Sequence, residues 1–439
     1  MMKQILNNLW NQRGQNVWLF AELVVVCFVA WTQIDPIVVK LFYQNLPAGF
    51  DIDRLVVAEV RDIKAFREVG EIGEEVDMRE DELFRAQMLL LKEHLIAQGD
   101  VESVTCLDEM GGYPRMDRPL RTLPFGNDTL YVPECYYDEG ENFFETFGIH
   151  PVAGSPSQHE MSTDFHGNNT VVITRSLAER LYGSPEAAIG KQIQSGWTTE
   201  DGEHLLQTIG GVVEDVSAYD DEYSSWMLFS PNGRVGKGTR SRIVIRLKAD
   251  VNMQRFIEEQ NYHIEELSTE YLTIGGFIPY QEVASIDNIS NEFVHTNDYD
   301  FNLSIATAIF FLINLCLGVI GTFWMQTKRR TEESGIMRAF GATRGRIMGM
   351  FLAEGFVLTT ISMFITCVLY MNYVKTGLGE LRIPYYLQPD PTWVANKPLH
   401  FLIISGIVYV IILIVVSIGI AIPAWNICRT KIVAALRDE

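Results

Sequence analysis

The sequence predicts an α-helical membrane protein with four transmembrane helices plus a large α+β extracytoplasmic domain inserted between the first and second. Two observations predict this fold class. The chain contains four apolar runs, and one long polar stretch, residues 35–302, separates the first run from the second. That stretch is strongly acidic, whereas the shorter segments beside the apolar runs are basic. Because Lys and Arg resist translocation, the basic segments are expected inside and the acidic stretch outside.

The four expected spans cover residues 17–34, 303–325, 347–373 and 401–425. The last three are long enough to cross roughly 30 Å of hydrocarbon. The first is shorter, and it is expected to end at Asp35-Pro36. It does not read as a secretory signal peptide, because no small-residue cleavage site follows it.

Charge sets the orientation of these spans. Residues 35–303 contain 21 Lys and Arg against 48 Asp and Glu, which gives that stretch a net charge of −27. Residues 1–16, 326–346 and 426–439 each contain more basic than acidic residues. We therefore expect these three segments in the cytoplasm, with both termini inside. The acidic domain argues against binding to nucleic acid or to an anionic membrane surface.

Residues 1–16 precede the first span. Ile5, Leu6, Leu9 and Trp10 share one helical face, which predicts an amphipathic helix lying on the inner leaflet. On composition alone, residues 1–16 could equally well be a frayed tail. The first span itself contains Glu22, an acid that is costly inside a bilayer. Glu22 either has a pairing or gating role, or its side chain simply reaches the lipid headgroups.

The stretch 35–302 alternates strand-like and helix-like patterns. Strands are expected at 54–60, 101–107, 130–132, 170–174, 205–213 and 241–247, and helices at 78–98, 176–182 and 253–267. Residues 142–147 form a short apolar patch. Cys106 and Cys135 are the two cysteines of this stretch. They form either one disulfide or two buried free thiols, and we favour the thiols.

Residues 326–346 connect the second and third spans. Most of this cytoplasmic connector is patterned as one short helix, which Thr331 can cap and Gly341 can end. Ile336, Ala339 and Phe340 fall on one face of that helix. In the last span, Gly406 and Gly419 are small positions for close helix approach, either within one copy or between two.

The connector matches the pattern R-x-x-E-x-G-I-x-R-A-x-G-A-T, which resembles the signature of the FtsX-like permease domain of ABC systems. The matching positions are Arg330, Glu333, Gly335, Ile336, Arg338, Ala339, Gly341, Ala342 and Thr343. Ser334 stands where the family usually has Ile, and Glu354 matches the family's F-L-x-E-G pattern. An ordinary basic loop is the bland alternative.

Three phrases of the outer stretch resemble the periplasmic core domain of MacB-type permeases. They lie at residues 131–154, 171–194 and 208–216. With the connector, the resemblance covers nearly the whole chain. In this family, residues 279–302 correspond to a stalk that continues the second membrane helix outward.

The resemblance implies a permease subunit of the bacterial inner (cytoplasmic) membrane, without catalysis of its own. It implies a separate cytoplasmic ABC ATPase subunit whose groove receives the connector. It also implies a second permease copy, as homodimer or heterodimer, and allows a periplasmic adaptor or outer-membrane component. ATP hydrolysis in the partner would then move the outer domains, a mechanism called mechanotransmission, for export or efflux.

No cofactor is expected. The glycines near Lys191 and those of residues 233–239 lack the G-x-x-x-x-G-K-[ST] spacing that a phosphate-binding loop requires. No zinc-ligand spacing or Ser/His/Asp grouping suggests an enzyme. Two related functions remain open: regulation of a cell-wall hydrolase, as in FtsX proper, and lipoprotein release, as in LolC and LolE. The sequence does not name the cargo or the direction of transport.

Overall fold

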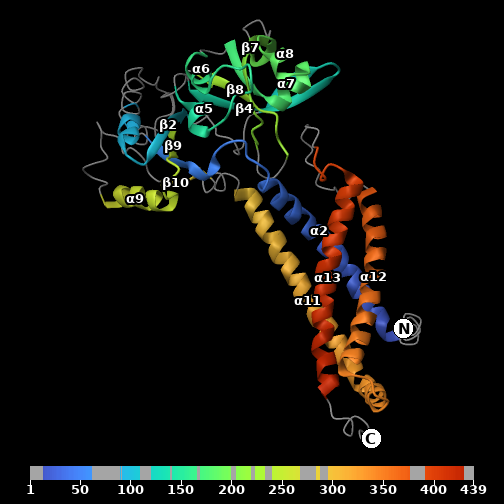
Figure 1. Ribbon diagram of the computed structural model, residues 1–439. Helices are drawn as coiled ribbons and strands as arrows, with labels where there is room; N and C mark the ends of the chain where they lie inside the picture. The colour runs from blue at the N-terminus through green and yellow to red at the C-terminus, as the bar shows by residue number, and fades with distance from the viewer. Residues whose placement is uncertain are drawn as a thin grey trace, which may run out of the picture. The chain divides into compact units, whose positions relative to one another are not determined.

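The structure is a computed structural model, and it describes residues 13–61, 89, 91–108, 120–138, 141–165, 169–198, 204–218, 223–232, 240–266, 283–286, 295–375 and 391–429 (Figure 1). The chain divides into two compact units. The membrane unit comprises Met1–Phe42, Asn297–Tyr385 and Asp390–Glu439, and the sheet unit comprises Tyr43–Thr296 and Tyr386–Pro389. The amphipathic helix expected before residue 13 and the tail after residue 429 lie outside the described residues.

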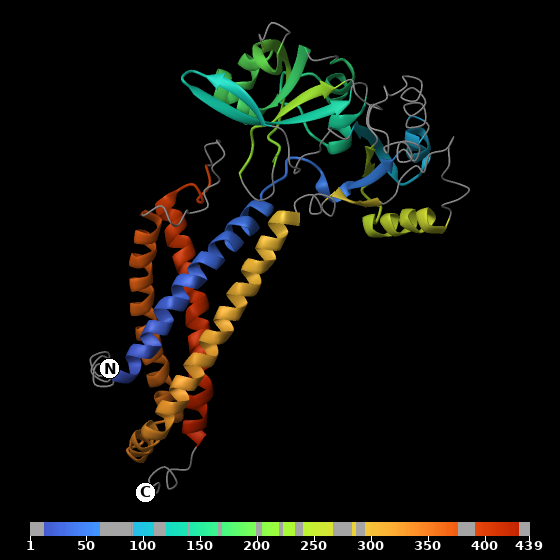
Figure 2. The ribbon, with the colours of Figure 1, turned by 180° about the vertical axis from the view of Figure 1, so that it is seen from behind.

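Four long helices form the membrane unit: α2 (Arg13–Gln44), α11 (His295–Ala339), α12 (Arg344–Lys375) and α13 (Lys397–Arg429). Both ribbon views show them lying side by side (Figure 1, Figure 2). Each contains a segment apolar and long enough to cross a membrane, namely Val17–Gln44, Asn302–Gly321, Arg344–Lys375 and Lys397–Trp425. The four expected spans are therefore confirmed.

Two expected helix ends differ from the structure. Helix α2 does not end at Asp35-Pro36 but continues to Gln44, with Pro36 inside it. Proline removes one backbone hydrogen bond, but its φ fits a helix, and the buried residues Ile34 and Val39 hold both sides of it.

The connector is not a separate helix capped by Thr331. It is the last part of α11, which runs without a break to Ala339. Residues 326–331 are mostly good helix formers, so nothing there interrupts the second span. The predicted end at Gly341 is correct, because the helix stops two residues earlier and Gly341 has φ 90°.

Two glycines of the membrane unit lie where two helices of the same chain approach each other closely. A Cβ on Gly419 of α13 would lie 2.8 Å from Val319 Cγ1 of α11. A Cβ on Gly355 of α12 would collide with Ile420 of α13. Gly406 has no such neighbour within 4 Å. Gly419 therefore belongs to packing inside the chain.

One sheet of the sheet unit has four antiparallel strands in the order β10-β1-β9-β2. The strands are β1 (Leu55–Arg61), β2 (Val101–Asp108), β9 (Arg240–Leu247) and β10 (Val283–Ser285). Helix α9 (Met253–Glu266) packs on this sheet through Phe256 and Ile257. Residues 89 and 91–97 of the helix expected at 78–98 are helical, and the rest of it lies outside the described residues apart from Gln98.

The other sheet has six strands in the order β3-β4-β8-β5-β7-β6, with parallel pairs β4–β8 and β5–β7. Its edge strands β3 and β6 also contact each other, so the sheet curls. Its strands are β3 (Leu120–Phe125), β4 (Asp128–Asp138), β5 (Thr170–Thr174), β6 (Gln192–Thr198), β7 (His204–Val213) and β8 (Leu228–Asn232). The strand expected at 130–132 is thus part of a longer one.

The sheet unit also contains the short helices α5 (Phe143–Phe147), α6 (Gln158–Thr163), α7 (Arg175–Tyr182) and α8 (Pro185–Ala188). Of these four, α7 and α8 pack on this second sheet, α5 packs on β2 and β9 of the first sheet and on Phe229 of β8, and α6 packs on α5. The apolar patch expected at 142–147 is α5, whose phenylalanines are fully buried. Cys106 and Cys135 are buried and unbonded, which confirms the prediction of two thiols. Burial raises the pKa of the Cys106 thiol well above its usual value, and nearby Glu141 adds to the shift.

Candidate coupling site

The turn between α11 and α12 is built by the Gly-Ala-Thr part of the connector signature. Gly341 has the left-handed φ of 90°, and its N–H donates to the Arg338 carbonyl at 3.0 Å. The N–H of Ala342 donates to the Met337 carbonyl at 2.9 Å. These two bonds form a Schellman motif, which satisfies the last carbonyls of α11. Met337 and Ala342 also pack together on the membrane-unit core, as this motif favours.

Thr343 starts the next helix. Its Oγ1 accepts a hydrogen bond from the Arg346 N–H at 3.3 Å, and its carbonyl accepts from the Ile347 N–H at 3.3 Å. A threonine N-cap of this kind stabilises a helix start by about 1 kcal/mol. The motif therefore stops one helix and starts the next within four residues, which fixes the path of the connector.

The outer face of this turn is apolar and exposed. Ile336 is 48% exposed and Phe340 88% exposed, and Ala339 between them is exposed as well. Arg344 and Arg346 are exposed just beyond the turn. We call these five residues the coupling surface. An apolar patch rimmed by basic residues is typical of a docking surface for a protein.

The structure brings together only part of the predicted coupling set. Arg330, Glu333 and Gly335 lie on the helical backbone of α11, and their side chains lie outside the described residues. Arg338 and Ala342 are half-buried at the base of the turn. The roles of these residues stay predictions.

Of the two predicted intramembrane acids, Glu354 is buried in the helix bundle and Glu22 is half-buried. Glu22 of α2 packs over Gly318 of α11, where an added Cβ would collide with the carboxylate. Glu354 of α12 is 2% exposed and precedes Gly355 at the crossing with α13. Acids in such positions are held by protein and not by lipid.

A polar and aromatic cluster at the far end of the bundle was not predicted from the sequence. Trp31 Nε1 of α2 donates to Ser405 Oγ of α13 at 3.1 Å, and its ring lies 3.7 Å from the ring of Tyr370 in α12. His400 Nε2 lies 2.6 Å from Asp35 Oδ1. The signal was available, since an acid and a histidine at the ends of two apolar runs are unusual.

In the sheet unit, the chain that follows α2 is bound at several points. The N–H of Ser217 donates to the Ala48 carbonyl at 2.9 Å, and the N–H of Asp51 donates to the Phe147 carbonyl at 3.0 Å. Gly49 has φ 78°, and any Cβ there would collide with the backbone at Asp215. We call residues 48–51 the linker. These contacts fasten the linker to α5 and to the segment that follows β7.

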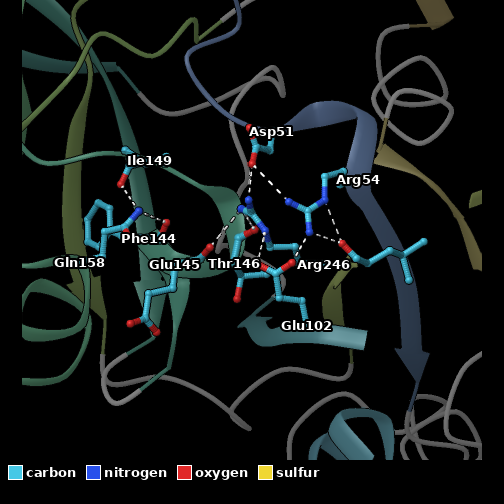
Figure 3. A network of polar contacts seen from close by, with 10 residues as sticks. Asp51, Arg54, Glu102, Phe144, Glu145, Thr146, Ile149, Gln158 and Arg246 are labelled. Carbon is cyan, nitrogen blue, oxygen red and sulfur yellow. Dashed lines mark hydrogen bonds and ion pairs between the residues drawn. The ribbon is translucent and has the colours of Figure 1, made fainter. Parts of the chain in front are cut away.

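Arg246 of β9 lies at the centre of this attachment (Figure 3). It donates to the carbonyls of Glu145 at 3.2 Å and Thr146 at 3.3 Å, and it pairs with Asp51 and Glu102. A Cβ on Gly148 would lie 2.6 Å from Arg246 Nη1. The phrase at residues 131–154 thus contains a glycine at position 148 because the arginine occupies the space.

Two other phrases from the sequence are joined in the same way. Arg175 Nε donates to Glu214 Oε2 at 2.8 Å, and the Ser176 N–H donates to Asp215 Oδ1 at 2.8 Å. The hydrogen bond from Arg175 lowers the pKa of the Glu214 carboxyl below its usual value. The carboxylate of Asp215 also lies at the N-terminus of α7, where negative charge is favourable. These contacts stabilise the fold of the sheet unit.

Comparisons with known proteins agree with the resemblance. Residues 305–432 match the family model "FtsX-like permease C-terminal", and residues 118–260 match "MacB-like periplasmic core domain". The chain is 29% identical over 128 residues to the ABC transporter permease YtrF of Bacillus subtilis (strain 168). That alignment covers 28% of this chain and 29% of YtrF, so the chain matches less than a third of its relative's length.

A solved structure is also similar to part of the chain. The periplasmic region of MacB from Actinobacillus actinomycetemcomitans matches with 16% sequence identity, over 57% of this chain and 97% of that chain. The TM-score is 0.30, so this likeness carries no weight here. The two family models and the four membrane helices do carry weight: residues 305–432 are an FtsX-like permease domain, residues 118–260 are a MacB-like periplasmic core domain, and this is the domain content of the MacB/FtsX type of ABC transporter permease.

Proposed function

We propose that this chain is the permease subunit of a MacB-like ABC transporter in the bacterial inner membrane. It couples ATP hydrolysis by a separate ATPase subunit to a movement of the sheet unit outside the membrane, for export or efflux. The observation that carries the proposal is the coupling surface, because it presents an apolar face at a turn whose backbone is fully specified. The turn and both termini are cytoplasmic in this proposal, as the charge distribution favours.

The coupling surface suits a protein partner better than lipid. Phe340 is 88% exposed on a segment with Arg344 and Arg346 close by, and water would otherwise cover it. Burying a phenylalanine side chain contributes about 1.5–3 kcal/mol to binding. Arg330, Glu333, Gly335 and Arg338 are proposed to complete the contact, because they precede the surface on the same helix.

Movement of the turn is proposed to reach the outer domain through continuous helices. α11 runs unbroken from His295 to Ala339, so a push on its last turn shifts the whole rod. α2 is followed by the linker, which is hydrogen-bonded to α5 and to the segment after β7 and is ion-paired to β9 through Arg246. A displacement of α2 therefore pulls on a firmly attached segment.

A second permease copy is part of the proposal. Only 17% of the α11 span is buried, against 39% for α2 and for α12. Its exposed side chains are Leu303, Ile309, Phe310, Ile313 and Leu317. A second copy on this face would bring two coupling surfaces together for two ATPase subunits. A periplasmic adaptor or outer-membrane component is proposed only on the family resemblance.

The experiment is reconstitution of the full chain with its partner ABC ATPase, identified by co-purification. We expect Phe340→Glu to reduce ATPase stimulation to the level of the ATPase alone, while the chain still inserts. Leu206→Glu is the matched control, because Leu206 is 55% exposed in the sheet unit. Stimulation that survives in Phe340→Glu would remove the coupling surface from the mechanism.

The same preparation separates the related functions. Export of a small molecule from vesicles supports the efflux role. Release of a lipoprotein from the vesicles, or activation of a co-purified cell-wall hydrolase without transport, would favour the other two functions and overturn the efflux part of the proposal.

A further inference from the structure

Asp35 and His400 join the first and last helices of the membrane unit. Asp35 lies on α2 and is 4% exposed, and His400 lies in the first turns of α13 and is fully buried. The pair lies near the end of the bundle where α12 finishes, opposite the coupling surface where α12 begins. The aromatic rings of Trp31, Tyr370 and Phe401 pack together at the same end of the bundle as the pair.

Both ring nitrogens of His400 face oxygen acceptors. Nδ1 lies 3.0 Å from the carbonyl oxygen of Val394, and Nε2 lies 2.6 Å from Asp35 Oδ1. A carbonyl oxygen only accepts, so Nδ1 must carry a hydrogen. If Nε2 then carried none, its lone pair would face a carboxylate at hydrogen-bond distance. That arrangement is repulsive, and it would leave one negative charge buried without compensation.

The neighbouring groups do not replace the hydrogen that is needed between His400 Nε2 and Asp35 Oδ1. The ring of Trp393 stands edge-on to His400 at 5.3 Å and shields it from solvent. Among the described residues at this end of the packed helices, the titratable side chains are those of Lys40 and Tyr43 of α2, Cys367, Tyr370, Tyr373 and Lys375 of α12, and Lys397 at the start of α13. None of these can place a hydrogen between Nε2 and Oδ1, which are already 2.6 Å apart.

We propose that Asp35 and His400 form a proton-binding clasp between α2 and α13. When the clasp is closed, one proton lies between Nε2 and Oδ1 in addition to the hydrogen on Nδ1. The pair is then neutral as a whole, which suits its buried position. When α2 and α13 separate at this end, the carboxylate stays ionised and the imidazole keeps one hydrogen. One proton is released for each clasp that opens.

The clasp gives the bundle a sensitivity to pH that does not depend on the proposed function. A solvated imidazole is mostly neutral above about pH 6.5. Closing the clasp above that pH therefore takes up a proton, and a rising pH favours the open form. The proton concentration on the side of the membrane that the clasp faces would thus bias how tightly the first and last helices are joined.

The test is nitrogen-15 NMR of the full chain, labelled at histidine and held in lipid nanodiscs. The other histidines of the eight serve as internal references. We expect both nitrogens of His400 to remain hydrogen-bonded and unchanged in shift between pH 6 and pH 8.5. The His400 signal is assigned by its absence in His400→Gln.

Asp35→Asn distinguishes the clasp from an ordinary buried histidine. The amide of asparagine can donate a hydrogen to Nε2, so this variant keeps both contacts with a neutral imidazole. We expect it to fold and to show an unprotonated Nε2 at pH 7 and above. If His400→Gln does not fold, His400→Asn takes its place for the assignment.

Two results would overturn the proposal. The first is that Nε2 of His400 loses its hydrogen in the unmodified chain as the pH rises from 6 to 8.5. The second is that the Nε2 signal at pH 8 is the same in Asp35→Asn as in the unmodified chain, which would mean that Asp35 holds no additional proton.

Discussion

Replacement of Gly148 by alanine should weaken the attachment of the linker. Two effects add at this position. The φ of 70° costs a non-glycine residue about 1 kcal/mol. The new Cβ would lie 2.6 Å from Arg246 Nη1, so the guanidinium must move away from the carbonyls of Glu145 and Thr146.

The second effect can be estimated from the contacts that are lost. A hydrogen bond from a charged donor contributes about 1.5–3 kcal/mol. The Arg246 side chain is 10% exposed, but Asp51 is 44% exposed, so solvent screens their ion pair. We expect about 1–3 kcal/mol from displacement of Arg246 and about 2–4 kcal/mol in total.

Gly154→Ala is the matched control. Gly154 has φ 90° in the same unit, and a Cβ there meets nothing within 4 Å. It should show only the backbone cost of about 1 kcal/mol. The measurement is amide hydrogen exchange of β9 and α5 in the full chain in nanodiscs. Equal protection losses in Gly148→Ala and Gly154→Ala would show that Arg246 does not depend on the empty space at Gly148.

Three further outcomes are expected. Thr343→Ala should destabilise the first turn of α12 by about 1 kcal/mol, seen as faster amide exchange at residues 345–347, whereas Thr343→Ser should keep the cap; unchanged exchange in Thr343→Ala would contradict the cap. Gly419→Val should separate α13 from Val319 and lower the thermal midpoint of the full chain, whereas Gly406→Val should not, because Gly406 has open space; equal midpoints would contradict the crossing. The pKa of Glu214 is lowered by Arg175, so its stabilising effect is present above the ordinary carboxyl range and is lost as the pH falls through the lowered value. The denaturant midpoints of the unmodified chain and Glu214→Gln should therefore converge between pH 6 and pH 3.5, and a constant difference would contradict this.

Membrane architecture was predictable because hydrophobicity and charge act over whole segments. The four spans followed from run lengths of apolar residues, and Gly341 followed from the preference of left-handed backbone for glycine. The helix ends were less predictable. Pro36 and Thr331 carry local signals for an end and a start, but packing of Ile34 and Val39, and the helix-forming residues before Thr331, outweigh them.

The outer domain was predictable where a strand is long and apolar, as at 170–174 and 241–247. The strands β3, β6, β8 and β10 were missed: β10 has only three residues, and the other three contain proline, glycine or polar residues whose pairing depends on distant partners. For the same reason, neither Arg246 nor the Asp35–His400 pair was predicted. In both, residues far apart in the chain meet only after folding; Asp35 and His400 are each unusual at the end of an apolar run, but no spacing in the sequence pairs them.

Site-specific photo-crosslinking in cells tests the central claim most directly. A photoreactive amino acid would replace Phe340 in the full chain, and a second version would carry it at Leu206, which is also exposed. Our account predicts that position 340 captures a protein with ATP-binding cassette motifs and that position 206 does not. Capture of such an ATPase from position 206, or of only lipid from position 340, would contradict it.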